Sequence, residues 1–282
     1  MAVIDKPGIE ARRVAANPGL KLLQRLGYVV RGLLYGTMGV LALRIALGKP
    51  GGQATDLAGS LVYLISNPLG KWLLLVAIVG LLAYSLWGII RAVFDPLNRG
   101  SDPSGYMERL GFLSSAASYA ALAFFGLQIL IGAKSTSSGH DSTPQTIVPL
   151  LNHPAGGLLT AGVGVAAIAI GIGQFVEAYR ATFKNDLKGA EMTTTERNIV
   201  VALGRFGMFA RGVIFTIIGW FVLQAGLHHD PGQVQGFGGA FLFLLNNPFG
   251  PWLLGIVALG FIALGLHSFA CARWVRLMSS ST

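Results

Sequence analysis

Six polar side chains near one end of the apolar segments are the groups in this sequence most able to do chemistry. They are three arginines, a glutamine, a glutamate and a histidine: Arg31, Arg91, Gln174, Glu177, Arg211 and His267. Ionisable groups inside apolar segments are costly to bury and are functional candidates by default. Two interpretations stay open: a structural ion pair between Glu177 and one of the arginines, or a gate for a proton or a substrate at the inner rim of the membrane.

A second polar group lies between the apolar segments, and it consists of His140, Asp141, His153, His228, His229 and Asp230. Imidazole and carboxylate groups together could bind a transition metal. Adjacent histidines point apart in regular structure, however, and no H-x3-H spacing occurs. Solvated loop residues are the favoured interpretation, so we expect neither a metal nor a cofactor.

No enzyme signature accompanies these residues. The sequence has no phosphate-binding loop, no zinc-protease motif and no hydrolase nucleophile motif. The lone Cys271 cannot form an intrachain disulfide. Thr193 and Glu196 have the spacing of a capping box at the start of a helix, not of a catalytic pair. We therefore expect a protein that is not an enzyme.

The elements that must position these side chains are membrane-spanning helices. Apolar residues make up 53% of the chain and charged residues only 12%, too little charge to cover the surface of a soluble domain. Six apolar runs are long enough to cross a bilayer, and they are Tyr28–Leu47, Gly70–Arg91, Leu110–Gly132, Gly156–Ala178, Phe206–Leu227 and Gly250–Ala272. We expect an all-α membrane protein with six spans, the first of them uncleaved.

The distribution of lysine and arginine predicts the orientation of the spans. If the N-terminus is cytoplasmic, 17 of the 21 basic residues lie on the cytoplasmic side, and only Arg44, Lys49, Lys71 and Lys134 lie outside. The positive-inside rule then places both termini in the cytoplasm. The net charge of +9 is therefore a topology signal. No basic stripe with interleaved aromatic residues indicates a nucleic-acid partner.

The six spans are three copies of one two-helix unit. The copies share residues that open the odd spans and residues that precede the even spans: Arg25, Gly27, Asn67, Pro68, Gly70, Trp72, Arg109, Gly111, Pro154, Gly156, Arg205, Gly207, Asn247, Pro248, Gly250 and Trp252. The middle copy diverges, because Ser115 stands where the others have Arg31 and Arg211. Since each copy has two spans, all three share one orientation. A six-helix bundle of three parallel hairpins with pseudo-threefold symmetry about the membrane normal is the expected packing.

The repeat also sets the expected boundaries. Residues 1–20 are a cytoplasmic segment, the three repeats occupy 21–97, 98–184 and 185–275, and 276–282 form a cytoplasmic tail. Each Asn-Pro pair is expected to cap an even span, and each opening arginine to reach lipid phosphate. Trp72 and Trp252 are expected in the interfacial belt. Four further stretches are expected as short interfacial helices: Leu57–Ile65, Ile147–Leu151, Phe237–Leu245 and the region Lys21–Arg25.

These motifs resemble a bacterial domain-of-unknown-function family, number 1206. The resemblance rests on the Arg-Leu-Gly start, the Asn-Pro-x-Gly-x-Trp turn and the triplication, and it covers about residues 20–275. It implies a protein of the bacterial cytoplasmic (inner) membrane, and it carries over no catalytic residue.

Two function classes follow from this architecture. The first is a non-enzymatic membrane protein that acts as a scaffold or binds lipids or a partner. The second is a small transporter or channel with a path along the pseudo-threefold axis. Polar residues are scarce in the middle of the spans, which favours the first class. Membrane lipids are the expected partners, nucleic acid is not, and a protein partner or a second copy stays open.

Overall fold

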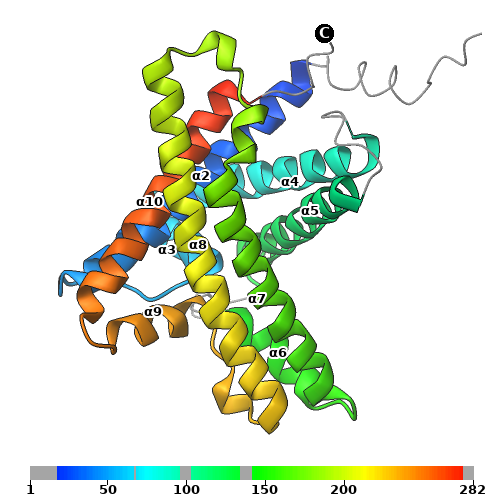
Figure 1. The fold of residues 1–282 in the computed structure, drawn as a ribbon, viewed down its shortest axis with the longest axis vertical. Coiled ribbons are helices and arrows are strands. Elements are labelled where there is room, and N and C mark those ends of the chain that lie inside the picture. The colour runs from blue at the N-terminus through cyan, green and yellow to red at the C-terminus, as the bar shows by residue number, and fades with distance from the viewer. Residues whose placement is uncertain (1–17, 67, 96–102, 134–141, 276–282) are drawn as a thin grey trace, which may run out of the picture.

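Six long helices dominate the structure. The computed structural model describes residues 18–66, 68–95, 103–133 and 142–275. The long helices are α2 (Pro18–Ala46), α4 (Gly70–Phe94), α5 (Pro103–Leu130), α7 (Gly156–Arg180), α8 (Thr194–His228) and α10 (Gly250–Trp274) (Figure 1). Each contains a stretch that is long and apolar enough to cross a membrane. The prediction of six spans is confirmed.

Short helices precede the second long helix of each repeat. They are α3 (Leu57–Ile65), α6 (Ser142–Leu151) and α9 (Phe237–Leu245). The described residues also contain the 3₁₀ turns η2 (Thr182–Asp186), η3 (Gly189–Glu191) and η4 (Pro231–Gln233). The first and third helices have the expected bounds, and α6 begins five residues earlier than expected.

The stretch around Lys21–Arg25 does not form a separate helix. It belongs to α2, which runs without a break from Pro18. The predicted capping box of Thr193 and Glu196 is present, and the helix it opens continues through the whole fifth span as the 35-residue α8. Neither helix has a proline after its first residue to interrupt the hydrogen-bond ladder.

The Asn-Pro pairs do not cap the even spans, so this prediction is wrong. The N-cap residue of α10 is Phe249, and the Asn247 side chain instead donates to the Phe243 carbonyl at the end of α9 (2.6 Å). Asn67 lies outside the described residues. The following glycine is the essential member of the turn, because a Cβ at Gly70 or Gly250 would collide with a carbonyl of the preceding short helix.

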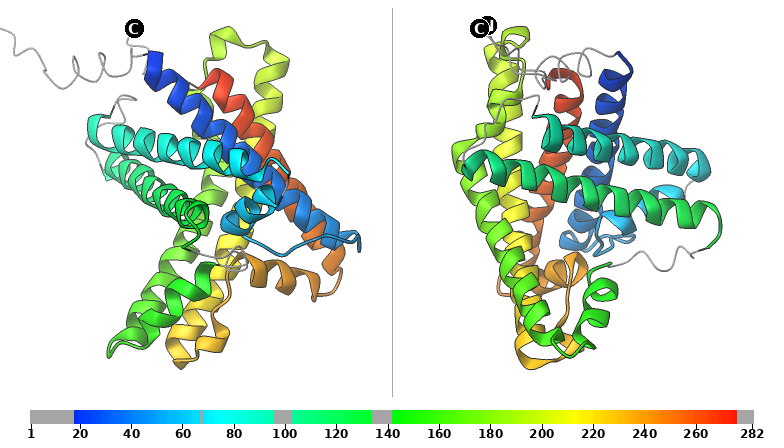
Figure 2. Two further views of the ribbon diagram at one scale, coloured as in Figure 1. Left: turned by 180° about the vertical axis from the view of Figure 1, so that it is seen from behind. Right: turned by 90° about the vertical axis from the view of Figure 1, so that its right-hand side faces the viewer.

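The long helices pack in a cyclic order. Three close pairs join the second helix of one repeat to the first helix of the next: α4 with α5, α7 with α8, and α10 with α2. Figures 1 and 2 show the three pairs meeting near the middle of the molecule and extending away from it in different directions. The third pair returns from the last repeat to the first, as a pseudo-threefold arrangement requires.

Equivalent residues form the three pairs. In α2 and α10, a Cβ added at Gly32 would lie 3.0 Å from the Gly265 carbonyl oxygen. In α7 and α8, a Cβ added at Gly212 would lie 3.0 Å from the Gly171 carbonyl oxygen. The corresponding positions of α4 and α5 carry a serine and an alanine, and there the Ser85 hydroxyl donates to the Ala116 carbonyl (2.8 Å). The small side chains let the backbones approach closely at all three crossings.

The middle repeat is open. The two helices of the first repeat pack together, as do those of the third, whereas α5 and α7 share almost no contact surface. A Cβ at Gly27 would meet Tyr84 of α4, and one at Gly207 would meet Leu264 of α10, but one at the equivalent Gly111 would meet nothing within 4 Å. Only 22% of the apolar windows of α5 and α7 is buried, against 56% in α2, α4 and α10.

We predict that Gly171→Leu destabilises the protein by about 1–3 kcal/mol, because the added side chain must separate α7 from α8. The matched control is Gly173→Leu, two residues along the same helix, where a Cβ would meet nothing within 4 Å. Thermal unfolding of the two purified variants in one detergent measures the difference. Equal midpoints for the two variants would contradict the assigned packing.

Candidate functional site

An arginine and three tyrosines form a cluster where α2, α4 and α5 meet. The Arg31 Nη1 atom donates to the Tyr84 hydroxyl (2.6 Å), and its guanidinium carbon lies 5.5 Å from the ring centres of both Tyr35 and Tyr84. The Tyr119 hydroxyl of α5 lies 3.5 Å from that of Tyr35. Cation–π contacts and the hydrogen bond hold the guanidinium inside the bundle.

Arg211 of α8 reaches the same cluster from the third repeat. Its guanidinium carbon lies 5.8 Å from the Tyr35 ring centre and 5.3 Å from that of Phe215. Tyr35, Tyr119 and Phe215 each stand four residues after the equivalent positions of Arg31, Ser115 and Arg211. One aromatic ring from each repeat therefore lies near the pseudo-threefold axis. We call Arg31, Arg211, Tyr35, Tyr84, Tyr119 and Phe215 the axial cluster.

Arg91 lies next to this cluster on α4. It is buried, and its guanidinium carbon lies 4.2 Å from the Phe112 ring centre and 5.7 Å from that of Trp87. Asp186 of η2 acts on it electrostatically. The structure therefore brings all three predicted arginines to one region of the bundle, around aromatic rings.

Glu177 is not brought to these arginines. Its carboxylate accepts hydrogen bonds from the Thr182 hydroxyl (2.5 Å) and from the backbone N–H of Phe183 (2.9 Å). Both donors belong to η2, so Glu177 fastens the chain where it leaves α7. In the part of the chain that the structure describes, this contact stands in place of the expected ion pair with an arginine.

His267 joins α10 to α8. Its Nδ1 atom lies 3.0 Å from the Val200 carbonyl oxygen, and because a carbonyl carries no proton, Nδ1 is the donor. The Nε2 atom is then an acceptor and lies 3.4 Å from the thiol of Cys271, which is buried. The Phe183 ring packs edge-on against the imidazole. The contacts of His267 are thus those of a core residue, while Gln174 is half-buried on α7.

Two of the three opening arginines cap the end of a neighbouring helix. Arg109 donates to the Ala92 and Val93 carbonyls at the end of α4 (2.7 and 3.2 Å). Arg205 donates to the Tyr179 carbonyl near the end of α7 (2.6 Å). A cation here satisfies carbonyls that lack helical partners and complements the helix dipole. These contacts explain the Arg-x-Gly signature better than the expected contact with lipid phosphate. Arg25, the third of the set, is exposed.

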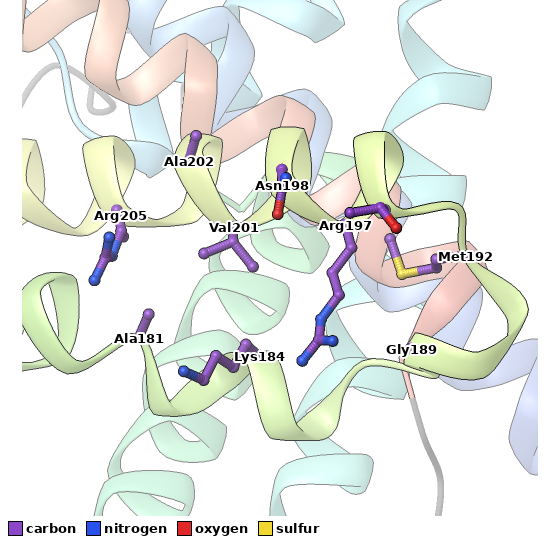
Figure 3. A pocket seen from close by; sticks show the side chains of 10 residues that line it. Ala181, Lys184, Gly189, Met192, Arg197, Asn198, Val201, Ala202 and Arg205 are labelled. Atoms are coloured by element: carbon purple, nitrogen blue, oxygen red, sulfur yellow. The ribbon is translucent and has the colours of Figure 1, made fainter.

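A basic pocket of about 490 Å³ lies between the first turns of α8 and the η2–η3 segment. Its lining includes Lys184, Arg197 and Arg205 together with the polar side chains of Thr194 and Asn198. Figure 3 shows these three cations around one opening, with Arg197 reaching from α8 toward the η2–η3 segment. One side of the pocket has a sequence signal, because Arg197, Val201 and Arg205 are spaced four residues apart on one face of α8. In the sequence the two arginines indicate only the orientation of the spans.

An apolar groove of about 620 Å³ adjoins this pocket on the outer surface of α7 and α8. Its lining consists of Phe175, Ala178, Tyr179, Arg205, Phe206 and Phe209. Arg205 therefore lines both the pocket and the groove. The groove runs from the pocket toward the middle of the two helices.

The histidines and aspartates of the second polar group belong to the end of the molecule that carries the short helices. Among the residues described, no three histidine, cysteine or acidic side chains are grouped closely enough to hold a metal ion. His228 contacts the Gln224 carbonyl of its own helix, and Asp230 caps the η4 turn through Gly232. His140 and Asp141 lie outside the described residues.

The fold and these sites define a multi-pass membrane protein built from three copies of a two-helix repeat. The family described as Domain of Unknown Function (DUF1206) matches residues 26–95, 110–181 and 206–275, once in each repeat. The chain belongs to this family, which confirms the resemblance seen in the sequence.

One curated relative supports the same assignment. The chain is 33% identical over 268 residues to an uncharacterized protein, YxxB, of Bacillus subtilis (strain 168), and the match covers 95% of both chains. No solved structure matches the chain. The family assignment thus brings no activity with it.

We predict that Glu177→Ala destabilises the protein by about 1–3 kcal/mol, because two donors of η2 lose their acceptor. Glu191→Ala is the control, since its ion pair with Lys188 lies at the surface and should contribute less than about 1 kcal/mol. Unfolding midpoints of both variants measure the difference. A cost for Glu191→Ala as large as that for Glu177→Ala would refute the assigned role.

Proposed function

We propose that this protein is a non-enzymatic lipid-binding protein of the bacterial cytoplasmic membrane, and that the pocket between α8 and the η2–η3 segment holds the headgroup of an anionic phospholipid. The observation that carries the proposal is the junction of a basic pocket with an apolar groove at Arg205. A phospholipid has the same two parts, an anionic headgroup joined to apolar chains.

The charge of the pocket suits a phosphate group. Lys184, Arg197 and Arg205 supply three cations, and basic pockets between spans on the cytoplasmic side are typical headgroup sites. Three acidic residues near these cations along the chain have other partners. Asp186 acts on Arg91, Glu191 pairs with Lys188, and Glu196 closes the capping box with Thr193. Lys184 and Arg197 thus keep their charge available to a ligand, and Arg205 adds a third charge while one of its nitrogens caps α7.

The length of the site matches one leaflet of a membrane. Arg197 in the pocket and Phe209 in the groove are 12 residues apart on the same helix. At 1.5 Å per residue they are about 18 Å apart along the axis, close to the half-thickness of a bilayer core of about 30 Å. Acyl chains that follow α7 and α8 would therefore reach from the headgroup to the middle of the bilayer.

A transport path along the pseudo-threefold axis is less well supported. The axis is occupied by Tyr35 and Tyr119, whose hydroxyls lie 3.5 Å apart, and by Arg31 and Arg211. An axis that side chains close at this level, instead of a continuous polar path, is expected of a binding or scaffolding protein. The proposal names membrane lipid as the partner and needs neither nucleic acid nor a second protein.

We predict that the purified protein retains phosphatidylglycerol in preference to phosphatidylethanolamine, as native mass spectrometry from mixed micelles can measure. Lys184→Gln combined with Arg197→Gln should weaken phosphatidylglycerol binding roughly 30-fold, at about 1 kcal/mol for each cation removed. This double variant keeps Arg205, and with it the cap on α7. Arg180→Gln is the matched control, because Arg180 is exposed at the same end but lines neither cavity.

A second arm separates a lipid from free phosphate as the ligand. Inorganic phosphate should compete only weakly, because it cannot occupy the groove, and Phe209→Gln should weaken binding of the two-chain lipid alone. The proposal fails if phosphatidylglycerol and phosphatidylethanolamine bind equally, or if inorganic phosphate displaces the lipid at equal concentration.

The proposed orientation places both termini, and with them the pocket, in the cytoplasm. Alkaline phosphatase is active only when exported, so we predict active fusions after residues 55, 140 and 232 and inactive fusions after residues 100 and 188. Activity of the enzyme in bacteria that express each fusion is the measurement. The reverse pattern would place the pocket on the outer face and exclude a lipid of the cytoplasmic leaflet.

A further inference from the structure

We propose that Arg31 and Arg211 form a second binding site, for a small inorganic anion of about the size of chloride, at the centre of the bundle. This site is separate from the lipid pocket and shares no residue with it. It rests on the charge, the position inside the bundle and the unsatisfied donors of the axial cluster.

The two guanidinium groups carry charge that the surrounding protein does not balance. Arginine stays protonated in proteins. Both guanidinium carbons lie within 6 Å of the Tyr35 ring centre, and the contacts that hold the two arginines are with aromatic rings and the Tyr84 hydroxyl. Two like charges in an apolar interior are costly unless an opposite charge joins them. An anion between them would supply that charge.

Each arginine also has a buried N–H group that could donate a hydrogen bond to an anion. The Nε atoms of Arg31 and Arg211 are buried and have no hydrogen-bond partner in the described residues. Buried N–H groups of charged side chains are rarely left unsatisfied. The tyrosine hydroxyls of the cluster are further donors, so the lining is rich in donors, as an anion requires.

The site lies inside the bundle, away from the basic pocket. Arg211 lies 14 residues after Arg197 on α8, which corresponds to about 21 Å along the helix. Both side chains contact the axial ring of Tyr35 instead of extending toward the helix ends.

The repeat supplies a sharp variant for the test. The middle repeat carries Ser115 at the position of Arg31 and Arg211, so Arg211→Ser introduces a residue that this fold already holds at the equivalent place. Arg44→Gln is the control, because Arg44 belongs to the last turn of α2, at the opposite end from the pocket.

The experiment follows the unfolding midpoint of the purified full chain in chloride and in gluconate at equal ionic strength. A ligand of the folded state raises the midpoint with its concentration. We expect chloride to raise it and gluconate not to, and we expect Arg211→Ser to weaken the apparent chloride affinity about tenfold or more. Arg44→Gln should respond as the unmodified chain does.

Broadening of the ³⁵Cl resonance of free chloride is a second measurement. It reports exchange with the bound site at one temperature, and it can be carried out on Arg31→Lys, which keeps the charge, if Arg211→Ser does not fold. Broadening by the unmodified chain that Arg31→Lys reduces supports the site. Equal responses to chloride and gluconate, or equal chloride affinity in Arg211→Ser, overturn it.

The two proposals fail separately. The variant Lys184→Gln with Arg197→Gln should lose phosphatidylglycerol and keep its response to chloride. Arg211→Ser should show the opposite behaviour.

Discussion

The close approach of two backbones between successive repeats is the constraint on which the rest of the structure depends. Lipid is as apolar as a leucine side chain, so helices in a membrane gain little by burying apolar groups against each other. They are held by dense packing, which requires small residues at the crossing. Gly32 with Gly265, and Gly212 with Gly171, meet this requirement at equivalent places, and Ser85 with Ala116 meets it with a hydrogen bond added.

That packing also determines where the charges go. Once α2 and α8 each lie against an even helix, the residue just before the contact glycine, an arginine in both cases, contacts the aromatic rings of the axial cluster. The same arrangement places the opening arginines of α5 and α8 at the ends of α4 and α7, where they cap carbonyls. Arg31 and Arg211 thus lie among aromatic rings inside the bundle, whereas Arg109 and Arg205 lie at helix ends at its rim.

Much of the fold could be predicted from the sequence, because apolar length and internal repetition are strong signals. The six spans and the bounds of α3 and α9 follow from them. The choice of packing partner could not be predicted, since the pattern within one repeat suggests a hairpin, whereas the closest pairs join different repeats. The clustering of Arg31, Arg91 and Arg211 could be predicted, because all three are near the same end of their spans. The partners of Glu177 could not be predicted, because they lie in the turn immediately after α7. The pocket depends on the fold of the η2–η3 segment, which has no clear sequence signal.

The open middle repeat has a consequence for how this chain can vary. A helix face that contacts another helix must be both apolar and small, whereas a face that contacts lipid need only be apolar. Gly27 and Gly207 are under the stricter condition, and Gly111 is under the weaker one. The equivalent position of the three repeats therefore differs in the side chains it can accept, and the middle copy is the one with room for a larger one. Because the bundle is pseudo-threefold but open at the middle repeat, the exposed faces of that repeat can change while the other two repeats keep the helices packed together.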